Sequence, residues 1–117
     1  MIFKKQLKHL ASLLVLWQAK RIYAKAVKAA DKKHKDEGCA VYVVEYPPES
    51  RRLMALSGKE YRILRSYYKR GGTVMHLKCR CFYHTKDRMG NDALSAKRIE
   101  VRRLAFSRML LSRAKLL

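Results

Sequence analysis

The pattern of apolar and polar positions predicts a long helix at the start of the chain. Residues 4–36 contain neither Gly nor Pro, and the chain can leave the helix at Gly38. At about 100° per residue, the apolar positions form two stripes on nearly opposite faces of this helix. The first stripe contains Phe3, Leu7, Leu10, Leu13, Leu14 and Trp17, and the second contains Val15, Leu16, Ala19, Ile22, Tyr23, Ala26, Val27 and Ala30.

Two apolar faces on one helix require two packing partners. A helix of this length would also be about 45 Å long, which exceeds the width of a compact domain of this size. We therefore expect the second stripe to pack on the domain itself, and residues 3–17 to bind another protein chain. The contact residues would be Leu7, Leu10, Leu14 and Trp17, on a part of the helix (residues 1–20) that protrudes from a single domain spanning 1–117. The alternative is that the C-terminal helix folds back over the first stripe.

Two strands are predicted after this helix. Residues 40–46 are rich in β-branched and aromatic side chains, and residues 51–57 are a suitable antiparallel partner. Pro47 and Pro48 cannot continue a ladder, so the hairpin must turn there. Two strands alone are marginally stable, and we expect helices to cover one of their faces.

Two further helices complete the predicted fold. The first begins at Ser57 and Glu60, which have the spacing of a capping box, and runs to Arg70 before a pair of glycines. The second runs from about Leu94 to Leu116. Residues 73–85 between them fit either a strand or a short helix. We therefore predict a mainly helical α+β fold with a long N-terminal helix, a β-hairpin, a short middle helix and a C-terminal helix.

The charge of the chain narrows the class of partner. Lys and Arg number 28 against 9 Asp and Glu, which gives a net charge of +19 over 117 residues. An apolar content of 49% is too high for a disordered basic tail, so we expect a folded domain. A folded chain with this charge is suited to a polyanion, and DNA or RNA is the commonest long phosphate polymer.

Two basic helix faces are candidate contacts with nucleic acid. Arg62, Arg65 and Lys69 share a face of the middle helix that contains no acid. The C-terminal helix carries a second set, formed by Arg98, Arg102, Arg103, Arg108 and Arg113. An isolated basic triad is usually a solvated surface, but the high overall charge favours contact with a polyanion. No helix-turn-helix spacing and no RNA-recognition signature is present, so sequence-specific binding is not predicted.

A third group resembles a set of metal ligands. His76, Cys79, Cys81 and His84 fall within nine residues. On a strand the two His point away from the two Cys, and on a helix Cys81 turns away from His76 and Cys79, so the tetrahedral arrangement that zinc requires does not form. Small cysteines packed in a core explain the pattern better. We find no nucleophile with a base and no paired carboxylates, and we expect no enzyme activity, no metal and no cofactor.

Three segments of the chain, within residues 24–105, carry a family resemblance. They are AADKKHKDEGCAVYVVEY, LMALSGKEYRILRSYYKRGGTV and CFYHTKDRMGNDALSAKRIEVRR. With these segments the chain resembles a loose family of small uncharacterised basic proteins of gut bacteriophages and mobile elements. The resemblance implies a phage setting and a helix over residues 74–82. It implies no activity and no functional residues.

The location and function follow from these patterns. The start of the chain has the basic and apolar parts of a secretory signal, but no small-residue cleavage site follows. With no apolar run near 18 residues and an odd number of cysteines, we expect a chain in the cytoplasm or within a phage particle, without membrane contact. The predicted function is that of a nucleic-acid-associated accessory or structural protein, such as a virion component. The alternative is an adaptor that docks through its N-terminal helix into a larger protein complex without touching nucleic acid.

Overall fold

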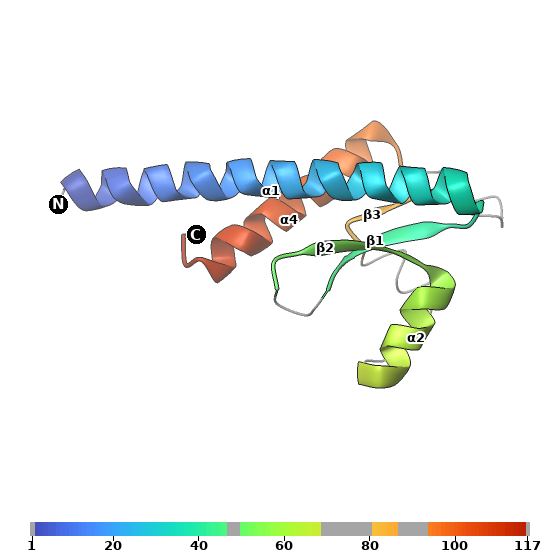
Figure 1. Ribbon diagram of the computed structural model, residues 1–117. Coiled ribbons are helices and arrows are strands. Elements are labelled where there is room, and N and C mark those ends of the chain that lie inside the picture. The colour runs from blue at the N-terminus through green and yellow to red at the C-terminus, as the bar shows by residue number, and fades with distance from the viewer. Residues whose placement is uncertain (1, 47–49, 69–80, 87–93, 117) are drawn as a thin grey trace.

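The computed structural model describes residues 2–46, 50–68, 81–86 and 94–116. The elements follow in the order α1 (Ile2–Glu37), β1 (Val41–Glu45), β2 (Leu53–Ser57), α2 (Gly58–Tyr68), β3 (Tyr83–His84) and α4 (Ala96–Arg113) (Figure 1). This order confirms the predicted mainly helical α+β fold. The sheet has three antiparallel strands, because β3 is added to the expected hairpin.

Strand β1 is the central strand of the sheet. Val43 is paired with Ala55 of β2 on one side and with Tyr83 of β3 on the other. Thr85 extends the second pairing, because its backbone N–H donates to the Val41 carbonyl at 3.0 Å and its hydroxyl accepts from the Val41 N–H at 2.8 Å. The end of segment 73–85 is therefore a short strand, whereas residues 73–80, and with them most of the helix that the resemblance implies, lie outside the described residues.

The core forms where α1 and α4 meet one face of the sheet. Ala19, Tyr23, Ala26 and Ala30 of the second stripe are buried, and the three alanines let the other elements approach α1 closely. They pack with buried side chains of the sheet and of α4, namely Val41, Val43, Tyr83, Phe106 and Leu110. The second stripe thus faces the protein's own core, although Leu16 remains 38% exposed.

Local sequence signals account for the helix ends. At the end of α1, Gly38 adopts φ +65°, a conformation that favours glycine, and its N–H donates to the His34 carbonyl at 2.8 Å. At the start of α2, the Glu60 N–H donates to Ser57 Oγ and the Ser57 N–H donates to Glu60 Oε1, both at 3.2 Å. This reciprocal pair is the predicted capping box. Ser95 caps α4, accepting from the Arg98 N–H at 3.3 Å.

The shape of the molecule is set by α1. The extents are 55 × 32 × 20 Å, and the first turns of α1 project beyond the end of α4 in Figure 1. The sheet and α2 lie to one side of α1, which leaves its opposite side without a covering element among those described. Within the described ranges, no helix has the length and apolar character needed to cross a membrane.

Candidate nucleic-acid interface

The basic set predicted on the middle helix is described only in part. Arg62 is exposed on α2, and Arg65 belongs to the same helix one turn later. Lys69 lies outside the described residues. Tyr61, on another face of α2, packs with Tyr42 and Cys81 on the side of the sheet away from α1. The sheet therefore anchors one face of α2 and leaves Arg62 in solvent.

The arginines of α4 do not form one surface. Arg98 and Arg108 are exposed. Arg102 points inward, where its Nη1 donates to the Cys81 carbonyl at 3.0 Å and approaches Cys81 Sγ at 3.4 Å. Arg103 donates from Nε to Glu100 at 3.1 Å and forms an ion pair with it. The predicted set is thus divided between two exposed cations and others that bind groups of the chain itself.

Arg113 shows the same division at the end of α4. It forms an ion pair with Glu45, the last residue of β1. The Glu45 side chain is only 11% exposed, so this pair fastens the end of α4 to the sheet rather than presenting a charge to solvent. Whether an arginine forms such an ion pair depends on which acid the fold brings near it. The sequence of α4 alone does not indicate that Glu45 lies beside Arg113.

A third basic set, which the sequence analysis did not identify, lies on the outer face of α1. We call it the basic stripe; its exposed members are Arg21, Lys25, Lys28, Lys32 and Lys35. They are separated alternately by four and three residues, so they share one face of the helix. The sequence contains a signal for this set, because the three- and four-residue spacing of its cations continues the spacing of Leu7, Leu10, Leu14 and Trp17. The apolar positions of this helix alone do not reveal it.

The earlier half of the same face is apolar, and we call it the apolar stripe. Leu7, Leu10, Leu14 and Trp17 are 51%, 62%, 56% and 54% exposed. The alternative in which the C-terminal helix covers them is therefore wrong, because α4 packs instead on the opposite face of α1, through contacts such as the ring pair of Tyr23 and Phe106. The Arg21 guanidinium lies 4.9 Å from the centre of the Trp17 ring and joins the apolar stripe to the basic stripe.

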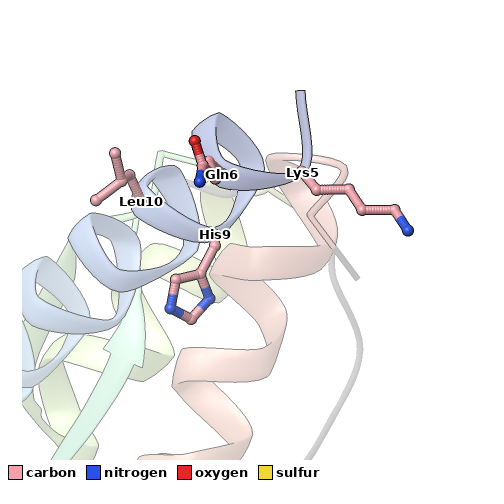
Figure 2. Close-up of a pocket in the computed structure, with 4 residues that line it drawn as sticks. All are labelled: Lys5, Gln6, His9 and Leu10. Carbon is pink, nitrogen blue, oxygen red and sulfur yellow. The ribbon is translucent and has the colours of Figure 1, made fainter. Parts of the chain in front are cut away.

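A shallow hollow lies beside the apolar stripe near the start of α1. Its lining residues are Lys5, Gln6, His9 and Leu10, and Figure 2 shows that all four belong to this one helix. Because neighbouring turns of a single helix form the hollow, it does not enclose a small molecule in the way that a ligand pocket does. It adds a cationic edge to the apolar stripe.

The candidate metal motif is described for two of its four residues. Cys81 and His84 are buried, whereas His76 and Cys79 lie outside the described residues. Burial raises the pKa of the Cys81 thiol, although the Arg102 guanidinium beside it acts in the opposite direction. The sulfur is therefore a protonated thiol at neutral pH, which is the less reactive form. In the described ranges, no three His, Cys, Asp or Glu residues gather in a way that would hold a metal ion.

Comparisons with known proteins identify no relative. The chain matches no protein-family model, no curated protein and no solved structure. The resemblance to small basic phage proteins therefore stays a prediction.

Proposed function

We propose that this protein is a non-enzymatic, nucleic-acid-associated accessory or structural protein that binds without sequence specificity. The observation that carries the proposal is the large excess of cations over acids in a chain that folds around a core. The chain has 28 basic residues and only 9 acidic ones, so most of its positive charge is not balanced by negative charge within the chain. Ion pairs in the described part of the chain engage Lys33, Arg103 and Arg113, and the basic stripe lies outside these pairs.

Phosphate neutralisation supplies the binding free energy in this mechanism. Exposed Lys and Arg side chains replace the counterions condensed on the nucleic acid, and the released ions favour the complex. Contacts of this type position the protein but read no bases. A phage particle is a setting that suits such a role, because packaged DNA needs neutralising cations.

Binding to unrelated duplexes over a range of salt concentrations tests the proposal. We expect similar affinities for duplexes of different sequence, and a linear fall of log K with log salt at about 0.9 per neutralised phosphate. Replacing Arg62, Arg65 and Lys69 together by Gln measures the share of α2 in that slope. Absence of binding at low salt would rule out a nucleic-acid partner.

The apolar stripe supports a second candidate function. Four large apolar side chains that are each more than half exposed form a contiguous strip, which commonly marks a protein interaction site. An adaptor that docks through α1 would bury this strip in a larger assembly. The apolar and basic stripes occupy different lengths of the same helix, so docking of a protein on the first would not block nucleic acid from the second.

A further inference from the structure

The outer face of α1 changes from apolar to basic along its length. From Arg21 to Lys35 the five members of the basic stripe cover about 21 Å, at 1.5 Å of rise per residue. Neighbouring cations are one helical turn apart, so they form a straight and regularly spaced row. The helix is held rigidly behind this row, because Tyr23, Ala26 and Ala30 on its opposite face are buried in the core.

The ion pairs found in the described part of the chain do not include members of the row. Asp31 is the one acid between Arg21 and Lys35 in the sequence, and Asp36 follows Lys35 directly. Asp31 accepts a hydrogen bond of 2.6 Å from the Tyr83 hydroxyl, which directs its carboxylate toward β3. Among the described residues, the ion pair formed by this part of α1 uses Lys33, which binds Glu60 on the side facing α2 and is not a member of the stripe. Five cations thus face solvent in line.

The chemistry of the row favours a nucleic-acid backbone over a protein partner. Between Arg21 and Lys35 the stripe contains no large apolar side chain, so a docked helix would bury charges without the apolar contacts that offset their desolvation. A phosphate backbone is itself charged and stays hydrated when bound. Binding of single strands relies on aromatic side chains for stacking, but the Arg21 guanidinium lies over the ring of Trp17, the aromatic residue beside the row.

We propose that the basic stripe of α1 is the main contact of this protein with a nucleic-acid duplex, and that it lies along the phosphate backbone. This inference rests on the proposed function and names the surface that performs it. The row is as long as the rise of about six base pairs, given about 3.4 Å per phosphate on each strand. It binds DNA duplexes of any sequence, since lysines that meet phosphates carry no base information.

Two variants with equal charge test the proposal. The first replaces Lys25, Lys28, Lys32 and Lys35 by Gln. The control replaces Lys4, Lys5, Lys8 and Lys59 by Gln. All eight lysines are exposed, and each variant loses four charges. Gln is a good helix former, so both variants should keep the fold, which near-ultraviolet circular dichroism verifies. The measurement is the affinity of the full chain for a fluorescent 20-base-pair duplex of arbitrary sequence, from low to moderate NaCl.

The expected result is a change in slope for one variant only. The slope of log K against log salt should fall by up to about 0.9 per lost contact, hence by up to about 3.6 for the stripe variant and by less than about 1 for the control. Equal changes in both variants would overturn the proposal, because binding would then follow net charge and not this row. An effect seen only with anionic lipid vesicles would overturn it in favour of a membrane surface.

Failure of the function and failure of the site are distinguishable. If the unmodified chain does not bind the duplex at low salt, the proposed function itself is wrong. If it binds and the stripe variant keeps its slope, only the site is wrong. Should the fourfold variant unfold, Lys28→Gln with Lys32→Gln serves in its place, with an expected fall in slope of up to about 1.8.

Discussion

At the scale of single residues, Tyr23 connects three elements. Its ring lies 6.5 Å from that of Phe106 on α4, and its hydroxyl donates to the Phe82 carbonyl at 2.6 Å. Phe82 in turn meets Phe106 edge to face at 5.2 Å. A buried hydroxyl that satisfies a carbonyl next to β3 therefore holds α1, α4 and the short strand in register with one another.

We predict that Tyr23→Phe lowers the unfolding free energy by about 1–2 kcal/mol at neutral pH. The variant keeps the ring but leaves the Phe82 carbonyl without this donor. Chemical denaturation of the two proteins measures the difference. A loss close to zero would mean that water replaces the hydroxyl.

The same substitution has a signature at alkaline pH. Burial raises the pKa of Tyr23 from 10.0 to about 12, against the lowering effect of the Arg102 guanidinium. The folded state holds the phenolic proton more tightly than the unfolded state, so this stabilisation is complete below pH 10 and is lost as the pH rises toward 12. Tyr23→Phe should remove this part of the decline. If the unfolding free energy of both proteins fell equally between pH 10 and 12, the decline could not be due to Tyr23.

At the scale of elements, the parts predicted well are those with local signals. The capping box of α2 and the glycine that ends α1 each lie within a few residues of the structure that they determine. The hairpin follows from β-branched strands on either side of two prolines. In contrast, β3 pairs with β1 across about forty residues, and the inward turn of Arg102 depends on where the fold places Cys81. Contacts between distant segments leave no periodic trace, so the sequence analysis left 73–85 open.

The candidate sites show the same contrast. The apolar stripe could be predicted, because its residues fall on the opposite side of the helix from the apolar residues that form the core. The basic stripe has an equally regular phase, but charged residues on a helix are usually only its solvated face, so their spacing alone does not indicate a binding site. Arg98 and Arg103 look equivalent in sequence, yet Glu100 engages one of them and leaves the other exposed.

The cap of α2 gives a prediction at this scale. Lys33 of α1 binds Glu60, and this contact, with help from Ser57, lowers the pKa of the Glu60 carboxyl against the effect of its partial burial. The charged form is therefore favoured by folding. Its contribution is present above the ordinary pKa of 4.5 and is lost as the pH falls through the lower folded value.

Two variants separate the charge from the cap. Glu60→Gln keeps an acceptor for the Ser57 N–H but loses the ion pair, so we expect a loss below about 1 kcal/mol at neutral pH that shrinks as the pH falls under 4.5. Ser57→Ala removes the cap of α2 and should cost about 1 kcal/mol at both pH values. Denaturation curves at neutral and acidic pH measure both. A pH-independent loss in Glu60→Gln would show that the ion pair contributes nothing.

At the scale of the whole molecule, α1 divides the protein into a packed side and an open side. The packed side carries the sheet and α4, and the open side carries the apolar stripe followed by the basic stripe. The two surfaces proposed for binding lie in line on one rigid helix, so their relative positions are fixed. If both proposals hold, a partner protein on the first half would keep a bound duplex at a constant distance and orientation.

The apolar stripe gives the last prediction, through Leu10→Asp combined with Leu14→Asp. Both side chains are more than half exposed, so the new carboxylates stay in water and the unfolding free energy should change by no more than about 0.5 kcal/mol for each site. If the stripe is an association surface, sedimentation should show a smaller species with unchanged circular dichroism.

Leu10→Gln with Leu14→Gln is the uncharged control. It should dissociate the protein as well, because the loss of apolar area, and not the added charge, is responsible. Loss of the folded signal in both variants would contradict the exposed position of the stripe. An unchanged mass with an intact fold would exclude self-association through this stripe, because two Asp side chains would then face each other in place of the two central leucines.

A docking partner would in that case have to be a different protein. Lys4, Lys5 and Lys8 lie on the same helix segment, so an acidic partner would fit this surface best.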